Sequence, residues 1–415
     1  MLGLLNVGQR QASSLVRGMR FGRLNGLGLL QAPSRSVISV PAIETWIPLK
    51  EREVLARLNV LASQKDGITV VMSLREKALN ALTHSSTPNE KDKEDLQKLD
   101  TILKHWLGGV FCAAAIETKR VTWGTSTGET LEKVADRDMV LQKVRSIREL
   151  KRRLDNGRRC MGIFHIGMPN DPLAFVHVAL MREIAPSYKF LSANASEAEA
   201  PTHAMFYSVN ALHEALSGLD MAARVIKCAA VEVKKEFPTL QVFSTLSPIP
   251  RFVKWLGTVA SGGSASSKGL KIPQQHQRSL ALATKLPLDT DQQTLLAATH
   301  AIISLGSDWT DQPALAQQLR PALTWLVTHY LVNEKSRGRG DQPLDPVARF
   351  HLRNGAMLYR VNWMGNETSA GMADAAGFMV NYLYEFDSRD ERAAVFASSG
   401  AFSVSKLVQD TLTGV

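Results

Sequence analysis

A serine that is followed at once by prolines stands at the end of an apolar segment and is the first candidate for chemistry. The segment 243–250 reads FSTLSPIP, so Ser247 lies between a strand-like run and two prolines. Proline fixes its own φ and cannot continue a central strand, so the backbone beside the serine is held rigid. We therefore predict a fixed hydroxyl, although a serine before proline is also an ordinary turn residue.

The second candidate is the imidazole of His351, which lies in a short stretch of mixed polar side chains. Residues 345–356 read DPVARFHLRNGA and lead towards Asn362, so an imidazole, amides and guanidinium groups come close together. Histidine is the side chain most often used for acid–base catalysis near neutral pH. A histidine early in a helix is also a common partly exposed residue, so it does not define a site by itself.

The third candidate is a loop of small residues before an apolar helix. Its members, predicted to bind substrate, are Ser217, Gly218, Leu219, Asp220, Met221, Ala222 and Ala223. Backbone N–H groups at such a helix start can receive a pyrophosphate. The same local pattern fits an ordinary turn, so other motifs must decide. Asp220 is expected either to orient His351 or to cap its own helix.

The elements that carry these motifs follow from the spacing of apolar residues. From residue 48 to about 148 the apolar spacing is three and four, which predicts helices. Short segments rich in Phe, Val and Ile then predict strands of one sheet. The predicted strands are 160–167, 173–180, 204–210, 240–246 and 377–384, and the predicted later helices are 219–237, 281–304, 314–331 and 346–362.

Helices first and then strands with inserted helices predict an α+β protein. The 415 residues exceed one ordinary core, so more than one domain is expected. We predict a leader at 1–43, a helical domain at 44–148, and a mixed-sheet catalytic domain with flanking helices at 149–415.

Half of the excess positive charge lies near the N-terminus. The formal net charge is +10, and residues 1–43 hold five arginines and no Asp or Glu. A leader without Asp or Glu and with spaced arginines is typical of mitochondrial targeting, although an ordinary basic tail has a similar composition. We expect the mitochondrial matrix, with the cytoplasm as the alternative, because the last residues match no peroxisomal signal. The charge is local, so no nucleic acid partner is expected.

Several kinds of site are not expected. The cysteines Cys112, Cys160 and Cys228 lack paired spacing, which argues against zinc and against disulfides and favours a reducing compartment. No two histidines have metal-ligand spacing, so no metal is expected. No apolar run approaches the ~18 residues of a membrane span, and no cofactor signature is present.

Several separated motifs resemble those of one family. The segments 243–250, 349–356 with 362–364, and 381–384 resemble signature segments of malonyl-CoA decarboxylases, and 117–123 resembles their domain junction. The likeness runs in the same order from about residue 68 to residue 384. Departures are Arg251, where the family commonly has Gly, and Leu383, where it commonly has a basic residue.

The resemblance implies a catalytic domain of the GNAT acyltransferase type, whose splayed central strands admit coenzyme A. It implies that Ser247 and His351 are catalytic and that Tyr384 lies near the substrate. It also implies that Ser217–Ala223 binds coenzyme A phosphates and that the helical domain makes the contacts of a homotetramer.

The expected reaction is decarboxylation of malonyl-CoA to acetyl-CoA and CO2, a step of fatty acid metabolism, without a cofactor. The enolate left by CO2 needs oxyanion donors and an acid, so we expect Ser247 to orient the carboxylate or a water and His351 to protonate the α-carbon. An apolar wall is expected from Phe243, Leu246 and Phe350. The alternatives are a GNAT-fold acyltransferase and a non-catalytic malonyl-CoA sensor.

Overall fold

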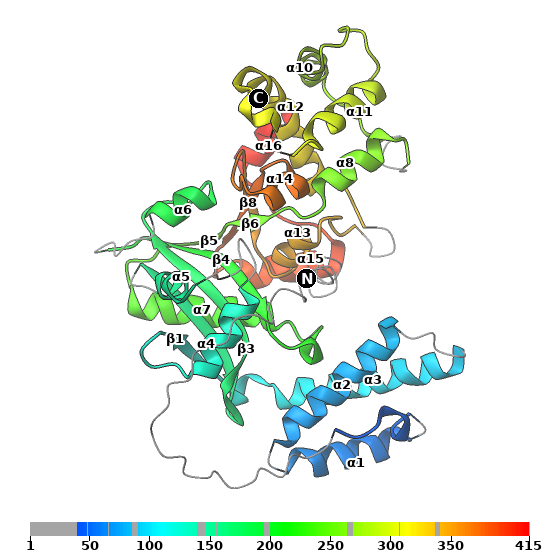
Figure 1. Cartoon of the computed structure of the whole chain (residues 1–415), viewed down its shortest axis with the longest axis vertical. Helices are drawn as coiled ribbons and strands as arrows, with labels where there is room; N and C mark the ends of the chain where they lie inside the picture. The colour runs from blue at the N-terminus through cyan, green and yellow to red at the C-terminus, as the bar shows by residue number, and fades with distance from the viewer. Residues whose placement is uncertain are drawn as a thin grey trace.

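The fold is α+β, as predicted, with helices first and a mixed sheet after them (Figure 1). The computed structural model describes residues 40–47, 49–64, 66–84, 90–138, 144, 146–154, 157–194, 200–263, 269–306, 308–336 and 341–414. Most of the predicted leader, residues 1–39, lies outside this part of the chain.

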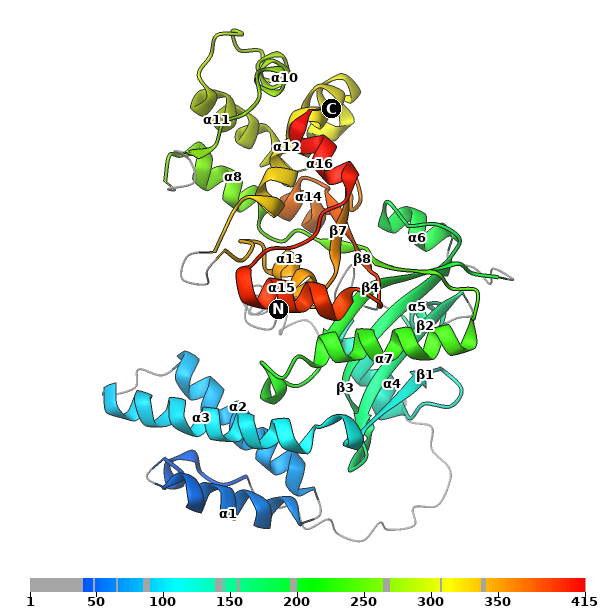
Figure 2. The ribbon, with the colours of Figure 1, turned by 180° about the vertical axis from the view of Figure 1, so that it is seen from behind.

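Three antiparallel helices form the N-terminal layer. They are α1 (Glu51–Ala62), α2 (Gly67–His84) and α3 (Glu90–Val110), after the short 3-10 helix η3 (Ile43–Thr45). The apolar spacing of three and four predicted these helices, and α3 buries the residues that have it, Leu96, Leu99, Leu103 and Leu107. Figures 1 and 2 both show the layer beside the loop that precedes α7.

The strands lie in one sheet. They are β1 (Ile116–Val121), β2 (Arg158–His165), β3 (Met168–Met181), β4 (His203–Ala211), β5 (Val242–Thr245), β6 (Ser247–Pro248), β7 (Met357–Asn362) and β8 (Met379–Tyr384). Over the described residues the order is β1-β2-β3-β4-β5-β8-β6, and β7 also pairs with β8. Among the strands named here β4 and β5 run parallel, and the other pairs are antiparallel.

The sheet opens between β4 and β5. Their parallel pairing ends at Phe206 and Thr245, although β4 continues to Ala211. The chain after β5 turns to pair with β8, where Ser247 lies opposite Val380. The two central strands therefore part just where Ser247 stands, which is the splayed arrangement expected of the GNAT type.

Each face of the sheet has its own helices (Figure 2). The helix α7 (Met221–Glu236) packs on the face that presents Met161, Ile163 and Val176. The alternate residues, such as Cys160 and Phe175, face α4 and α5 in a separate apolar cluster. The helices of that second face are α4 (Gly128–Arg137), α5 (Ile147–Arg153) and α6 (Tyr188–Asn194).

The C-terminal helices gather beside β7 and β8 (Figure 1). They are α8 (Phe252–Ala260), α10 (Gln274–Thr284), α11 (Gln292–Ile303), α12 (Pro313–Val332), α13 (Pro346–Arg353), α14 (Ser369–Ala375), α15 (Arg389–Ser399) and α16 (Lys406–Thr413). Short 3-10 helices are η4 (Ala113–Ala115), η5 (Glu214–Leu216) and η6 (Asp308–Asp311). No helix in the described ranges is long and apolar enough to cross a bilayer.

Three predictions of local structure were wrong. The predicted helix 346–362 ends at Arg353, because Gly355 has φ +78° and the β-favouring residues after it form β7. The predicted helix 281–304 is broken at Lys285, which has φ +59° and lies two residues before Pro287. The strand β1 lies within the range predicted to be helical, and the boundary of the two domains stays a prediction.

One buried arginine joins the helical layer to the loop before α7. Arg75 of α2 is 2% exposed, its Nε donates to Asp100 Oδ1 at 2.8 Å, and its Nη1 donates to the Ala215 carbonyl oxygen at 2.6 Å. A buried guanidinium requires such partners, because a buried charge without them is costly. Arg75 thus fixes η5, and with it the chain that leads to Ser217.

We predict that Arg75→Met lowers the free energy of unfolding by about 2–4 kcal/mol, because Asp100 and the Ala215 carbonyl lose their donor. Urea unfolding followed by circular dichroism measures this loss. The matched control is Lys98→Ala on α3, whose exposed ion pairs contribute at most ~1 kcal/mol. Equal midpoints for Arg75→Met and wild type would contradict the prediction.

Candidate active site

The structure brings Ser247 and His351 into direct contact. Ser247 Oγ lies 3.0 Å from His351 Nε2, across 104 residues of sequence. The serine comes from β6, and the histidine comes from α13. Their exposed fractions are 5% and 4%, so the pair is almost dry. Two residues that the sequence singled out separately therefore form one unit.

Asp345 sets the position of the helix that carries His351. Its Oδ1 accepts from the backbone N–H groups of Val347 and Ala348 at 2.9 and 2.8 Å, and Pro346 occupies the first helical position. Both features favour a helix start at this point. His351 lies one and a half turns further on, so the cap fixes where the imidazole stands.

Two tyrosines of β8 hold the imidazole in place. Tyr384 Oη lies 2.9 Å from His351 Nδ1, and the Tyr382 ring stacks on the imidazole with centroids 4.4 Å apart. Residues two apart on a strand share a face, which explains why both reach the same ring. The sequence identified Tyr384 through the resemblance but missed Tyr382, which the period of two would have indicated.

Burial determines the protonation states here. It lowers the pKa of His351 to about 3, because a dry site disfavours the imidazolium. It also raises the pKa values of the Tyr382 and Tyr384 phenols. At neutral pH the ring and both phenols are thus uncharged, and the imidazole carries one proton on one of its nitrogens.

A further hydroxyl, which the sequence analysis missed, touches Ser247. The Ser247 hydroxyl donates to Thr245 Oγ1 at 2.9 Å. Thr245 is 1% exposed and ends β5, two residues before the serine. The i, i+2 spacing on an extended chain could have indicated that the two side chains share a face.

The predicted substrate loop lies beside this site. Ser217–Asp220 joins η5 to α7, and Met221–Ala223 form the first turn of that helix. Gly218 with φ +78° and Asp220 with φ +52° form the sharp turn of the loop. A cleft of about 280 Å³ is lined by Leu219, Asp220 and Ala223 of the loop and by Tyr384. The cleft therefore joins the loop to the tyrosine that contacts His351.

Cations surround the cleft. Arg224 and Lys227 of α7, Arg353 at the end of α13, and Arg389 at the start of α15 all line it. The carboxylates at the cleft are Asp220 and Asp390, and each already pairs with one of these arginines. A positively charged cleft with a helix start at its edge suits a phosphorylated ligand.

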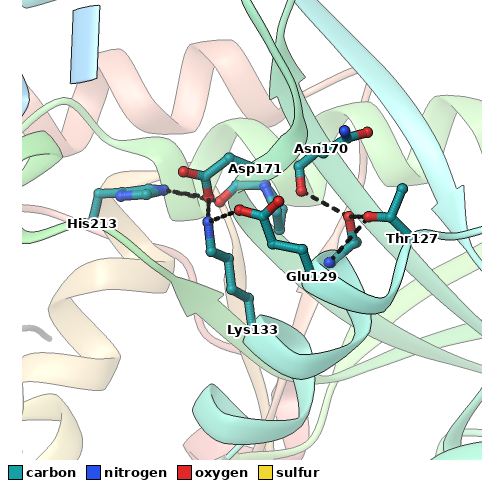
Figure 3. A network of polar contacts seen from close by, with 8 residues as sticks. Thr127, Glu129, Lys133, Asn170, Asp171 and His213 are labelled. Atoms are coloured by element: carbon teal, nitrogen blue, oxygen red, sulfur yellow. Dashed lines mark hydrogen bonds and ion pairs between the residues drawn. The ribbon is translucent and has the colours of Figure 1, made fainter. Parts of the chain in front are cut away.

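The chain that leads into the loop is anchored at His213, before η5, on the face away from α7. His213 Nε2 lies 3.1 Å from Asp171 Oδ1, and Lys133 Nζ lies 2.7 Å from the same oxygen (Figure 3). Lys133 belongs to α4, and Glu129 on that helix contacts it as well. The network thus ties α4 to the β3 end and to the residue before η5.

Two expected roles were wrong. Asp220 neither orients His351 nor caps α7, because it has a left-handed conformation and accepts from Arg353 Nη2 at 2.5 Å. Leu246 does not line the site, because it packs on the opposite face with Met181 and Tyr207. The rings of Phe350 and Phe243 do lie near: Phe350 packs edge-on against His351, and Phe243 contacts Phe386 of the cleft.

The described residues contain no group of three or more His, Cys, Asp or Glu that could hold a metal ion. The cysteines are free thiols, of which Cys112 is exposed, Cys228 is partly buried and Cys160 is buried.

Comparison with known proteins gives a consistent result. The model of the malonyl-CoA decarboxylase C-terminal domain matches residues 115–415. Mitochondrial malonyl-CoA decarboxylase of Anser anser anser is 31% identical over 354 residues, which are 84% of this chain and 67% of the relative. The rat enzyme, Rattus norvegicus, is 32% identical over 75% of this chain and 62% of its own length.

Solved structures agree with these relatives. The crystal structure of malonyl-CoA decarboxylase from Agrobacterium vitis matches with a TM-score of 0.70 and 28% identity, over 87% of this chain and 79% of that one. That from Cupriavidus metallidurans has a TM-score of 0.66 at the same identity. The chain spans 62–67% of the length of the curated relatives described above. Its matched segment, its fold and these relatives show that the chain belongs to the malonyl-CoA decarboxylase family.

Proposed function

We propose that this chain removes CO2 from malonyl-CoA and releases acetyl-CoA without a metal or an organic cofactor. The observation that carries the proposal is the buried contact of Ser247 with His351, next to a cationic cleft that reaches the loop Ser217–Ala223. Family membership supports the substrate, and the cleft supports a polyanionic carrier.

The reaction requires a hydrogen-bond donor and a proton donor from the protein. The bond between the carboxylate carbon and the α-carbon breaks, its electron pair moves to the thioester, and an enolate forms. The enolate oxygen needs a hydrogen-bond donor, and the α-carbon then needs a proton. The thioester is the electron sink, so the substrate itself supplies what a cofactor would otherwise provide.

The residues divide these roles. Ser247 Oγ accepts from a water beside the departing carboxylate and so orients that water, and His351 gives the proton to the α-carbon from the nitrogen next to Ser247. Tyr384 contacts the opposite ring nitrogen and keeps the ring oriented. The rings of Phe243 and Phe350 form the apolar wall that favours neutral CO2 over a carboxylate.

We also propose a mitochondrial location and a homotetramer. The curated relatives are named mitochondrial, and the acid-free leader 1–43 supports the same compartment. The tetramer is proposed from the family resemblance, with the helical layer α1–α3 as its contact region.

Decarboxylation is tested by CO2 release and acetyl-CoA formation from malonyl-CoA by the purified full chain, without added metal or cofactor. We predict that Ser247→Ala and His351→Asn each lower kcat/KM about 10²-fold or more, because each removes a group beside the reacting atoms. His276→Asn, which removes another buried imidazole, that of α10, should keep wild-type activity.

The outcome also separates the alternatives. Binding of malonyl-CoA without CO2 release by wild type would contradict decarboxylation and leave the sensor. Acyl transfer from the thioester to an amine, without CO2, would instead identify an acyltransferase.

The proposed acid works as a neutral imidazole. An ordinary histidine, with a pKa near 6.5, would be mostly cationic at pH 5. The pKa of His351 is lowered to about 3, so the neutral form persists through that range. A neutral ring can donate its single N–H to the carbanion without first taking up a proton. The imidazolate that remains is stabilised by the Tyr384 hydroxyl at Nδ1 and regains its proton from water before the next turnover.

We therefore predict that His351 does not titrate between pH 8 and pH 5, because its pKa is displaced downwards by burial. The measurement is 15N NMR of the free enzyme with labelled histidine, and His351→Asn identifies the signal among the ten histidines. A midpoint near pH 6.5 for this signal would show that the site is solvated.

A lysine from the helical layer lies close to the predicted substrate loop, Ser217–Ala223. Lys104 of α3 lies over Gly218, so that a Cβ atom at Gly218 would be 2.7 Å from Lys104 Nζ. Lys104 is half-buried and has no hydrogen bond or ion pair within the described part of the chain. Arg224 of α7, which lines the cleft, donates to the carbonyl of Phe111, so the chain at the end of α3 adjoins the cleft. An ammonium without a partner at this place suits a substrate phosphate.

We predict that Lys104→Ala lowers kcat/KM for malonyl-CoA about tenfold, the equivalent of ~1.4 kcal/mol, through KM. Malonyl-pantetheine, which lacks the phosphates, should be turned over equally by the variant and wild type. Lys98→Ala on the same helix is the charge-matched control. An equal loss with both substrates would mean that Lys104 only stabilises the fold.

A further inference from the structure

We propose that Thr245 is a positioning residue, which fixes the direction of the Ser247 hydroxyl and thereby holds His351 in the tautomer with its proton on Nε2. The inference deepens the proposed function, on which it rests, by assigning the proton that is delivered to the substrate. Thr245 itself is not placed in contact with the substrate.

The first step is the direction of one hydrogen bond. The geometry at the two hydroxyl oxygens makes Ser247 the donor and Thr245 Oγ1 the acceptor, at 2.9 Å. Thr245 Oγ1 also accepts from the Tyr382 backbone N–H at 3.2 Å. A hydroxyl oxygen has two lone pairs, so these two donors use the acceptor capacity of Thr245 fully.

The second step is a count of protons. A serine hydroxyl has one proton, and Ser247 gives it to Thr245. The contact of Ser247 Oγ with His351 Nε2 at 3.0 Å therefore needs its proton from the imidazole. A neutral imidazole has one N–H, so Nε2 carries it and Nδ1 accepts from the Tyr384 hydroxyl at 2.9 Å. Each group thus donates to the next, from Tyr384 to His351, from His351 to Ser247 and from Ser247 to Thr245.

The third step is the rigidity of the acceptor. The Thr245 carbonyl oxygen accepts from Asn381 Nδ2 at 2.8 Å, and the same amide donates to the Ala185 carbonyl at 3.0 Å. Asn381 is fully buried, and its Oδ1 accepts from Asn362 at 2.8 Å. Thr245 is therefore held by the strand β8 at both its backbone and its side chain, and cannot turn away from Ser247.

The consequence concerns the acid. With the proton on Nε2, the nitrogen beside Ser247 faces the reacting atoms as a donor. With the proton on Nδ1 it would face them with a lone pair and could not protonate the α-carbon. The tautomer of a catalytic histidine is set by the hydrogen bond that its environment offers, and a wrong tautomer is costly to the rate.

The test compares Thr245→Val, which keeps the shape but removes the acceptor, with Thr245→Ser, which keeps the acceptor. In the valine variant Ser247 is free to donate to Nε2, so the proton moves to Nδ1. The 15N chemical shifts of the two His351 nitrogens distinguish the tautomers directly, and they are read on the full chain without substrate. We expect Nε2–H in wild type and Thr245→Ser, and Nδ1–H in Thr245→Val.

Kinetics provides the second readout. We expect kcat for malonyl-CoA to fall roughly 10²-fold in Thr245→Val with KM nearly unchanged, and to recover to within about tenfold of wild type in Thr245→Ser. If Thr245 only supported the fold, kcat would fall alike in both variants and the tautomer of His351 would not change.

Each result decides the inference. Nδ1–H in wild type overturns it, and this measurement does not depend on the folding of any variant. Retention of Nε2–H in Thr245→Val overturns it as well, even if that variant is inactive. If wild type shows Nε2–H and the valine variant shows Nδ1–H but malonyl-CoA is not decarboxylated, the proposed function fails and the positioning role stands.

Discussion

The hydrogen bond between Ser247 and His351 is the contact on which the rest of the structure depends. It joins a two-residue strand to an eight-residue helix in a place that water hardly reaches, so neither partner can rely on solvent. The strand is held by its pairing with β8, and the helix by the Asp345 cap. The parting of β4 and β5 leaves the serine at the edge of the opening and not inside a continuous sheet.

The helical layer α1–α3 helps to position the substrate loop. Arg75 of α2 donates to the Ala215 carbonyl in a buried contact, and Arg224 of α7 donates to the carbonyl of Phe111, the residue after α3, in a partly buried one. These contacts connect the helical layer to the chain before α7 and to α7 itself. On the other face of the sheet Asp171 holds His213. The loop is therefore supported from both sides of the sheet, which is a requirement for backbone N–H groups that must keep one direction.

Much of the fold could be predicted from the sequence, because the apolar period reports local structure. Leu96, Leu99 and Leu103 revealed α3, and the Phe- and Val-rich segments revealed β2 to β4. The strands β1 and β7 were missed, because each forms only by pairing with a distant strand. Propensity over a few residues does not contain that information.

The site was predictable in part for the same reason. Ser247, His351 and Tyr384 were found by motif and resemblance, and the structure places them in one chain of contacts. Their partners Thr245 and Tyr382 carry no motif, and only the pleat of β5 and β8 brings them to the imidazole. The proximity of Lys104 to Gly218 depends on how a separate layer of helices is placed, which no local pattern contains.

One ion pair, Arg353–Asp220, links the part of the site proposed to bind the phosphates to the helix that carries His351. Arg353 is two residues after His351 on α13, and it binds Asp220 of the loop beside α7. A polyanion that settles on the loop competes with Asp220 for this guanidinium. Because Arg353 and His351 lie on the same short helix, binding of the phosphates at Arg353 would shift α13 and, with it, the imidazole of His351. Binding at the phosphate end of the substrate and alignment at its acyl end would then be one movement of that helix.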